Sequence, residues 1–455
     1  MGGGADMGGF PSSPALARRL ERLFARRTFG IKPGLDSVRA LLAALGDPQR
    51  SFRTIHVAGT DGKGSTCVFL DGMLRAAGLR TGLYLSPHLV RLTERFSIAG
   101  LEMDEDTLAA LVDEVETACA TLVAQGRPEP TFFETTTALC ALWFAREGVP
   151  LAVAEVGMGG RLDATNALES AVSAITRIGL DHTQFLGPTI RDIAREKAGI
   201  ARAGVPLVLG AMPEEAEAEI RRVAADVGAP VISAPDNCSV RFAPRRATAG
   251  EEAGSETARV AVSTAAADYG TARIALIGAY QAENVATAVT AFEALQRSLG
   301  VSLPAETVPR GLGIARLPGR FQRLCGEPRV WLDGAHNPCA AEALVGALRA
   351  ARAAKSVRLV CGMCADKDPA GFLRVLSPVA AKVWTVPLSN PRGLHPEKLG
   401  AFARGAGFRE VFPCATLEEG LAAARRDAAE ARAPMVVAGS LFLAGDVLAG
   451  GFFDR

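Results

Sequence analysis

The feature that most constrains the fold is a glycine-rich segment, GTDGKGST, at residues 59–66. It follows a strand-like run, Thr54–Val57, and precedes a helical run, Cys67–Ala77. This order favours a phosphate cradle, because backbone N–H groups converge at the helix N-terminus and the glycines permit close approach. The spacing is one residue shorter than the common Walker pattern. The alternative is a connector whose lysine is only solvated, and the flanking strand and helix favour the cradle.

Strand-like apolar runs alternate with helical patterns along most of the chain, which predicts an α/β fold with a mostly parallel sheet. The pattern is interrupted between residues 236 and 272, where short β-like pieces surround a polar loop at 249–257. A helix is predicted over Ala282–Leu299. The strands predicted in the first half are Thr54–Val57, Gly82–Leu85, Leu151–Val156, Ala171–Ile178 and Pro206–Leu209.

A second α/β unit is predicted after Pro304–Arg320, a segment with prolines, glycines and no clear period that we interpret as a linker. With 455 residues, the chain exceeds the size of one ordinary core. We expect one domain over residues 1–318, with 1–15 disordered, and a second over 319–455. The strands predicted in the second unit are Val330–Leu332, Arg358–Cys361, Val383–Val386 and Met435–Ala438.

Composition argues against several classes of partner. The formal net charge is +1, so no bulk field favours nucleic acid or an anionic membrane. We expect no signal peptide and no membrane span, because the most apolar stretch, Pro434–Phe453, contains Asp446 and several glycines. Nine scattered cysteines fit a reducing compartment, and we expect a cytoplasmic protein. Cys361 and Cys364 form a C-x-x-C that we interpret as two incidental thiols, since no second ligand pair accompanies them.

Polar side chains follow three of the predicted parallel strands. Lys63, Glu155 and His182 each come after the end of a strand. Because the carboxyl ends of parallel strands meet at one edge of a sheet, these side chains should converge. A carboxylate and a histidine beside phosphate oxygens favour a Mg²⁺ site. The alternative for His182 is a core or helix-capping histidine.

Seven motifs, in order along the chain, give a specific resemblance. They are AGTDGKGST, SPHL at 86–89, EVGMGGRLDATN, LDHTQFLG, REKAGI at 195–200, LPGRFQ at 317–322 and DGAHNP at 333–338. Together they resemble folylpolyglutamate synthase and dihydrofolate synthase, a branch of the Mur ligase family, over roughly residues 20 to 450. The resemblance implies a P-loop ATP-binding domain, a smaller Rossmann-like α/β C-terminal domain, and catalysis in the cleft between them.

The resemblance also implies cofactors and their ligands. Two Mg²⁺ ions are expected, the first bound by Ser86, Glu155 and His182, and the second by a carbamylated Lys197. The alternative for Lys197 is a surface lysine that pairs with Glu196 or Asp192. Residues assigned to ATP are Gly59, Gly62, Lys63, Gly64, Ser65, Asn284, Arg320 and Asp333. Residues assigned to the pterin substrate are Phe29, Gly30, Ile31, Lys32, Thr131, Phe132, Phe133, Glu134, Leu162, Asp163 and Ala164.

Two of these interpretations have open alternatives, and one residue departs from the family pattern. Phe132 and Phe133 either contact the pterin or pack their helix against the core. His336, which precedes a predicted helix, either helps to hold the carboxylate of glutamate or caps that helix. Tyr280 departs from the family pattern, because relatives have a histidine at this position, and the role of that histidine is in doubt here.

The implied reaction is an ATP-dependent amide ligation in which a pteroate or folate carboxylate is phosphorylated and then attacked by the amine of L-glutamate. Lys63, Lys197, His182 and His336 would carry the chemistry. The expected partners are small molecules only, and the expected state is a monomer that closes around its nucleotide. Two alternatives remain: a Mur-type ligase of a cell-wall precursor, for which the segment before residue 59 is short, and a nucleotide-binding regulator without ligase activity.

Overall fold

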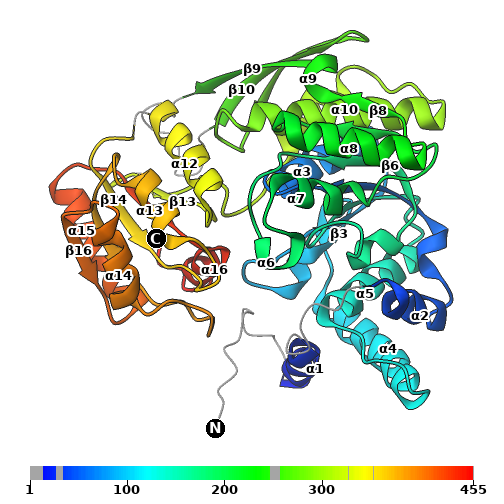
Figure 1. Ribbon diagram of the computed structural model, residues 1–455, viewed down its shortest axis with the longest axis horizontal. Helices are drawn as coiled ribbons and strands as arrows, with labels where there is room; N and C mark the ends of the chain where they lie inside the picture. The colour runs from blue at the N-terminus through cyan, green and yellow to red at the C-terminus, as the bar shows by residue number, and fades with distance from the viewer. Residues whose placement is uncertain (1–13, 27–33, 246–256, 326, 352, 454–455) are drawn as a thin grey trace.

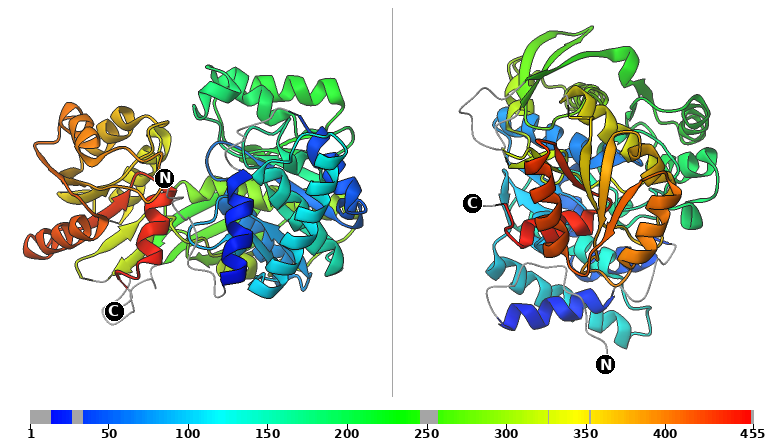
Figure 2. Two further views of the ribbon diagram at one scale, coloured as in Figure 1. Left: turned by 90° about the horizontal axis from the view of Figure 1, so that it is seen from below. Right: turned by 90° about the vertical axis from the view of Figure 1, so that its left-hand side faces the viewer.

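The structure, a computed structural model, describes residues 14–26, 34–245, 257–325, 327–351 and 353–453. Two lobes lie side by side (Figures 1 and 2). The N-lobe holds an eight-stranded sheet and a three-stranded sheet, and the C-lobe holds a six-stranded sheet. The fold is mixed α/β with largely parallel sheets, as the alternation of strands and helices predicts.

The central sheet of the N-lobe has a parallel core and an antiparallel edge. Strands β2, β5, β1, β6, β7 and β8 run parallel; β3 pairs antiparallel with β2, and β4 pairs antiparallel with β3. In spatial order the strands are β4 Leu101–Glu102, β3 Phe96–Ile98, β2 Thr81–Tyr84, β5 Leu151–Glu155, β1 Arg53–Ala58, β6 Ser170–Ile175, β7 Leu207–Leu209 and β8 Val231–Ser233.

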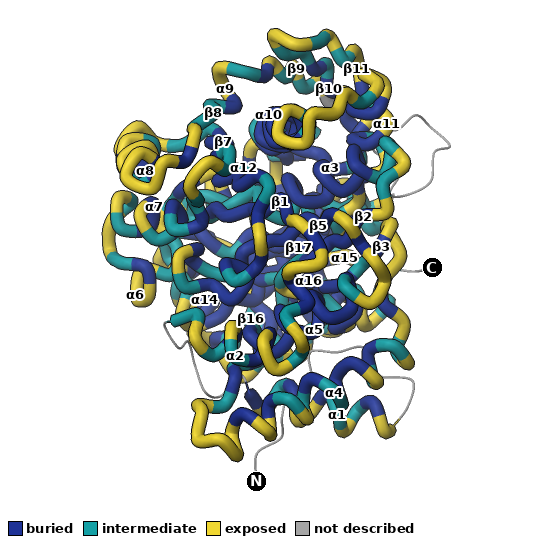
Figure 3. The backbone as a smooth tube through the Cα atoms, turned by 90° about the vertical axis from the view of Figure 1, so that its right-hand side faces the viewer, coloured by how far each residue is buried: buried dark blue, intermediate teal, exposed yellow. Residues whose placement is uncertain are grey.

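Both faces of this sheet are covered at its centre, so β2, β5 and β7 are buried along their whole length, whereas the edge strands β4 and β8 are not. Alternate β1 residues show the two faces: Ile55 and Val57 pack with the helices on one side, and Ala58 packs on the other. Figure 3 shows β1 and α3 buried at the centre of the molecule, with α8 at the exposed edge. One face carries α3 Lys63–Ala76, α10 Gln281–Leu299 and α11 Thr307–Ile314; the other carries α5 Phe132–Arg146, α7 Ile190–Ala198 and α8 Glu214–Val227.

Shorter elements complete the N-lobe. The three-stranded antiparallel sheet has the order β11-β10-β9 and packs against α10 and α11. Its strands are β9 Cys238–Arg245, β10 Thr257–Thr264 and β11 Asp268–Ile274. The remaining helices are α1 Pro14–Ala25, α2 Asp36–Ala44, α4 Glu105–Ala124, α6 Thr183–Leu186 and α9 Ala234–Asn237, with 3₁₀ turns at Pro48–Ser51, Leu92–Arg95 and Ala164–Ala167.

The C-lobe is built on a sheet that is parallel except for its first strand. Helices α12 to α14 cover one face, and α15 and α16 cover the other. The strands, in spatial order, are β12 Gln322–Cys325, β13 Val330–Leu332, β17 Met435–Ala438, β14 Val357–Cys361, β15 Ala380–Thr385 and β16 Glu410–Pro413. The helices are α12 Pro338–Ala350, α13 Pro369–Leu376, α14 Pro396–Gly405, α15 Leu417–Glu430 and α16 Leu441–Ala449.

Three expectations about the chain need correction. The segment Pro304–Arg320 is not a plain linker, because it contains α11, whose Val308 and Leu312 are buried in the core beneath α3. Pro14 and Ala15 begin α1, so disorder over 1–15 is wrong at these two positions, and residues 1–13 lie outside the described part. Thr257 is the first residue of β10, whereas the rest of the expected loop falls outside the described residues. No described helix is long and apolar enough to cross a membrane.

Candidate active site

The glycine-rich segment connects β1 to α3 and can be built only with glycine at two of its positions. Gly59 has φ +149°, and a Cβ there would lie 1.8 Å from Thr176 Oγ1. Gly62 has φ +85° and caps α3, and a Cβ there would lie 2.1 Å from Asn284 Oδ1. The loop therefore fits tightly between the end of β6 and the start of α10. Its N–H groups stand at the N-terminus of α3, which is the geometry that a phosphate cradle requires.

Two lysines meet behind this loop. Lys63 Nζ donates to the Gly59 carbonyl at 3.1 Å and to the Thr60 carbonyl at 3.1 Å. Lys197, on α7, is 4% exposed and donates to the same Gly59 carbonyl at 2.7 Å. Burial and the nearby Lys63 ammonium lower the pKa of Lys197 to about 7. Lys197 is therefore not a surface lysine paired with Glu196 or Asp192, and that alternative is wrong.

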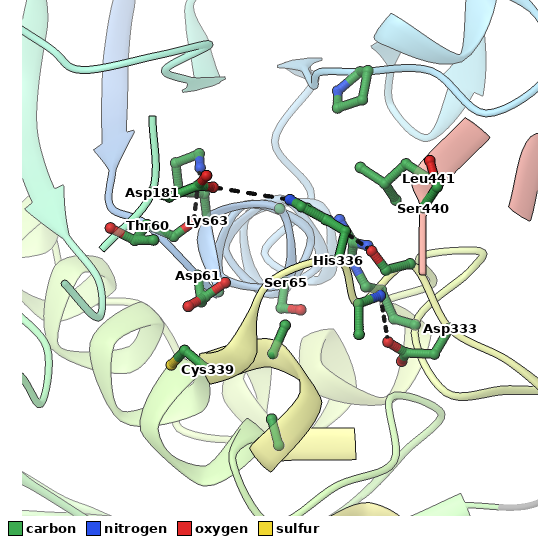
Figure 4. Close-up of a pocket in the computed structure, with 18 of the residues that line it drawn as sticks. Thr60, Asp61, Lys63, Ser65, Asp181, Asp333, His336, Cys339, Ser440 and Leu441 are labelled. Atoms are coloured by element: carbon green, nitrogen blue, oxygen red, sulfur yellow. Dashed lines mark hydrogen bonds and ion pairs between the residues drawn. The ribbon is translucent and has the colours of Figure 1, made fainter. Parts of the chain in front are cut away.

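A cavity of about 490 Å³ opens between the lobes in front of the cradle. Its walls come from both lobes, and Figure 4 shows side chains of the P-loop facing those of the loop before α12. Its polar lining includes Thr60, Asp61, Lys63, Ser65, Ser86, His88, Glu155, Arg177, Asp181, His182, Tyr280, Asn284, Arg320, Asp333, His336, Lys367, Arg392 and Ser440.

Ser86 and His182 lie on the loops after β2 and β6, and Glu155 is the last residue of β5, so all three lie at one edge of the sheet, as their positions at strand ends predict. Ser86 N donates to Glu155 Oε2 at 2.9 Å. Burial raises the pKa of Glu155, and the Lys63 ammonium offsets part of that rise. His182 has φ 51°, and its side chain makes no cap on α6. It occupies the N-cap position of α6, but its side chain lines the cavity and makes no capping hydrogen bond, so both structural alternatives for His182 are wrong.

Asp181 stands at the meeting point of the lobes. Its Oδ1 accepts from Lys367 Nζ, in the C-lobe, at 2.8 Å, and its Oδ2 lies 3.9 Å from His336 Nε2. Asp181 and His336 point toward one another across the cavity (Figure 4). Burial alone would raise the pKa of Asp181, but His336, His182 and Lys367 together hold it well below its usual range.

The C-lobe contributes a second set of polar groups at the loop between β13 and α12. Asp333 Oδ2 accepts from Phe321 N at 2.7 Å, and Oδ1 accepts from Ala335 N at 2.8 Å. His336 Nδ1 lies 2.8 Å from the Gly334 carbonyl, which can only accept, so Nδ1 carries a proton there and Nε2 is left facing Asp181. Asn337 caps α12 through Ala340 N at 2.7 Å. The helix-capping alternative for His336 is therefore wrong.

Comparison with known proteins decides the family. The chain matches the Mur ligase middle domain over residues 57–292 and the Mur ligase, glutamate ligase domain over residues 319–441. It is 35% identical to a dihydrofolate synthase/folylpolyglutamate synthase of Bacillus subtilis, over 81% of this chain and 84% of the relative. The chain belongs to the folylpolyglutamate and dihydrofolate synthase branch of the Mur ligases.

Other similar proteins include a relative of about twice the length and a solved structure with bound ligands. This Mur ligase is 40% identical to a probable bifunctional folylpolyglutamate synthase/dihydropteroate synthase of Haloferax volcanii, over 92% of the chain but only 49% of that relative. The chain thus spans about half the length of the haloarchaeal protein. The Escherichia coli FolC structure in complex with DHPP and ADP is 34% identical, with a TM-score of 0.81 over 96% of this chain and 98% of that one.

Most residues that the family resemblance assigns to ATP and Mg²⁺ gather around the cavity. The lining includes Gly62, Lys63, Gly64, Ser65, Ser86, Glu155, His182, Asn284, Arg320, Asp333 and His336. Gly59 and Lys197 lie just behind it, where Lys197 Nζ contacts the Gly59 carbonyl. Among the described residues, no group of three or more His, Cys, Asp or Glu side chains is arranged to hold a metal ion.

The residues that the resemblance assigns to the pterin are more dispersed. Phe29, Gly30, Ile31 and Lys32 lie outside the described residues. Thr131 and Glu134 form the capping box of α5, with Thr131 N donating to Glu134 Oε2 at 2.7 Å. Phe132 is buried in the N-lobe core, and Phe133 packs against that core. Both rings therefore pack α5 against the core, which is the alternative to contact with the pterin. Leu162, Asp163 and Ala164 form the turn after the Gly157–Gly160 loop, where Asp163 Oδ2 accepts from Met158 N at 2.9 Å.

Several cavity residues escaped the sequence interpretation, among them Lys367, Arg392 and Ser440. The rule that loops gather at the carboxyl ends of parallel strands could have found two of them. Lys367 follows β14, and Ser440 follows β17. Cys361 and Cys364, at the end of β14, are buried free thiols. Tyr280, which replaces the family histidine, lines the cavity and also packs against the C-lobe core.

Proposed function

We propose that this chain is an ATP-dependent ligase that joins L-glutamate to the carboxylate of dihydropteroate or of a folate through an acyl phosphate. The observation that carries the proposal is one cavity with two anion-binding walls. The P-loop and α3 form one wall, and the loop before α12, with Arg320 and His336, forms the other. A nucleotide on the first wall would place its terminal phosphate toward a substrate held between the two.

The first step is transfer of the γ-phosphoryl group to a carboxylate oxygen of the pterin substrate, with ADP as the leaving group. A carboxylate and a triphosphate repel one another, so the protein must neutralise both. Lys63 and Arg320 lie on the two sides of the cavity and supply that charge. Asn284 and Asp333 would fix the nucleoside end. Closure of the lobes around the acyl phosphate would exclude the water that hydrolyses it.

In the second step the glutamate amine attacks the acyl carbon, and phosphate leaves with the electron pair of the broken C–O bond. The N-terminus of α12 favours a carboxylate of the incoming glutamate. The attacking amine must lose a proton, and His336 Nε2 presents the lone pair that can accept it. Asp181 Oδ2, at 3.9 Å from that nitrogen, would stabilise the resulting imidazolium.

The residues present fit a Mg²⁺ ion at Ser86, Glu155 and His182. Glu155 is a carboxylate with 6% exposure, and within the described ranges Ser86 N is the one hydrogen-bond donor recorded for it. A buried anion of this kind is costly unless a cation accompanies it. Mg²⁺ keeps several water or phosphate ligands, so two or three protein ligands suffice. When bound, the ion would supply charge neutralisation at the phosphate oxygens.

A second Mg²⁺ would require Lys197 in its carbamylated form, because a free ammonium repels a cation and a carbamate attracts one. The buried position of Lys197 beside Lys63 supports this proposal. An amine with a pKa near 7 is partly neutral at physiological pH, and only the neutral amine reacts with carbon dioxide.

The pterin end of the substrate is assigned to the region of residues 29–32, 131–134 and 162–164 on the strength of the family motifs. The FolC complex with DHPP and ADP supports a small-molecule substrate bound together with a nucleotide, since that structure covers 96% of this chain. We further propose two domains, 1–318 and 319–455, in a cytoplasmic monomer. Asp163 and Glu134 would then combine a structural role with any contact to the pterin.

The test is a coupled assay of ADP formation with ATP and L-glutamate, with dihydropteroate or tetrahydrofolate as the second substrate. Turnover with dihydropteroate establishes the synthase activity, and turnover with tetrahydrofolate establishes chain extension. We expect both. A cell-wall ligase would need a nucleotide-linked peptide precursor instead, and a regulator would form no ADP with any of them. Absence of ADP formation with both pterins would overturn the proposal.

A further inference from the structure

Two contacts join the lobes on either side of the cavity, and both are made by residues that lie beside candidate metal ligands in the sequence. The first is the ion pair of Asp181 with Lys367, whose Nζ and Oδ1 are 2.8 Å apart. The side chains are 15% and 14% exposed, so water screens this pair less than a surface pair. Asp181 directly precedes His182, and Lys367 lies between β14 and α13.

Lys367 fixes the turn that carries His182. Asp181 Oδ1 accepts from Lys367 Nζ and also from the backbone N–H of His182, at 2.9 Å. His182 has a left-handed backbone conformation, with φ 51°, which is uncommon for a residue other than glycine. A carboxylate that is bound to both groups holds this conformation in place. The position of the His182 ring therefore depends on a cation from the other lobe.

The second contact is made by Leu89, three residues after Ser86. Its side chain packs against the C-lobe core beside Leu443 and Val447 of α16. The approach is close, because a Cβ on Gly445 would lie 2.1 Å from the Leu89 carbonyl oxygen. The loop that carries Leu89 is tied to Glu94, because Leu89 N donates to Glu94 Oε2 at 2.7 Å. Leu89 and Ser86 are joined by only two residues, so the contact of Leu89 with the C-lobe also restrains the position of Ser86.

We propose that Lys367 and Leu89 are positioning residues through which the C-lobe completes the metal-binding edge of the N-lobe. In this arrangement Lys367 fixes the position of the His182 side chain, and Leu89 fixes the position of Ser86. The proposed metal ligands therefore reach their binding geometry only when the two lobes are in contact. The roles of Ser86 and His182 rest on the proposed function. The contacts themselves do not, and they can be tested without any substrate.

The test compares Lys367→Met with Lys367→Arg and with a matched control, Lys382→Met. Lys382 also binds a carboxylate, Asp427, at 2.6 Å, but both residues lie within the C-lobe. Small-angle scattering of the protein without nucleotide should show a larger radius of gyration for Lys367→Met only. Lys367→Arg should restore the wild-type value, because it keeps the charge. If Lys367→Met and wild type scatter alike, the positioning role is wrong, whatever happens to activity.

Kinetics give a second readout. For Lys367→Met we expect kcat to fall by at least about tenfold with a smaller change in KM for ATP, since the P-loop itself is intact. A double variant, Asp181→Asn with Lys367→Met, should be no worse than the poorer single variant, because both break one contact. If the fold-losses in kcat of the two single variants multiply in the double variant, Asp181 and Lys367 do not act through one contact, and the positioning role of Lys367 is wrong. This outcome is distinct from failure of the proposed ligase activity, which would leave the wild type inactive as well.

Discussion

The ammonium groups of Lys63 and Lys197 donate to one carbonyl oxygen, that of Gly59, at 3.1 and 2.7 Å. Two like charges that share a neutral acceptor repel one another, and burial of Lys197 increases the cost. No hydrogen bond from either ammonium to a carboxylate is recorded among the described residues. The arrangement therefore favours an added anion beside the loop, which agrees with a triphosphate on one side and a carbamate on the other.

The first prediction concerns the shape of the P-loop. Gly62→Ala should weaken ADP binding by at least about tenfold, because the new Cβ would meet Asn284 Oδ1 and the loop must shift. Gly204→Ala is the control: its φ of +71° is also positive, but nothing lies within 4 Å of a Cβ there. Calorimetric titration with ADP measures both variants. Equal affinities for the two variants would mean that the loop does not hold the nucleotide.

The second prediction concerns Lys197. Lys197→Ala should lose most ligase activity, and short carboxylates such as acetate should restore part of it by replacing the carbamate. In ¹³C-labelled bicarbonate, the wild type should show a carbamate resonance that Lys197→Ala lacks. The exposed Lys398→Ala serves as the control for both measurements. Wild-type activity in Lys197→Ala, or an unchanged resonance, would remove Lys197 from the mechanism.

Local sequence predicts the regular parts of the fold and the edge of the sheet where most of the candidate site residues gather. The P-loop can be predicted from sequence because its glycines, its lysine and the flanking strand all lie within about 25 residues. The convergence of Glu155 and His182 followed from the strand-end rule. Strands β3 and β8 are not predicted because each contains a serine and is only partly buried, so neither gives a continuous apolar run. Strands β7 and β13 are equally short, but they are fully buried and wholly apolar. The Asp181–Lys367 contact was also missed, since it joins residues 186 positions apart that meet only through the packing of two lobes.

The third prediction concerns the pH dependence of stability. His56 is fully buried on β1, and burial with the nearby Arg202 lowers its pKa to about 3. The unfolded chain takes up a proton near pH 6.5, and the folded chain does not, so stability is complete above that pH and is lost as pH falls toward 3. At pH 5.5 the loss from this group is about 1.4 kcal/mol.

A variant isolates that contribution. In urea titrations, His56→Gln should reduce the stability difference between pH 7.5 and pH 5.5 by roughly 1.4 kcal/mol. The glutamine amide can still reach Thr165 Oγ1, which lies 2.8 Å from His56 Nε2. His395→Gln, at an exposed helix end, is the matched histidine control. If His56→Gln keeps the full pH dependence of the wild type, other buried groups are responsible.

The most direct test of the ligase mechanism follows oxygen from the substrate carboxylate. Dihydropteroate labelled with ¹⁸O in both carboxylate oxygens is converted with ATP and L-glutamate, and the released phosphate is examined by ³¹P NMR. If an acyl phosphate forms in the cavity between Lys63 and His336, one carboxylate oxygen becomes bonded to phosphorus and leaves with it. Each released phosphate should therefore contain one ¹⁸O atom. Amide product accompanied by unlabelled phosphate, or by label in AMP, would contradict the account.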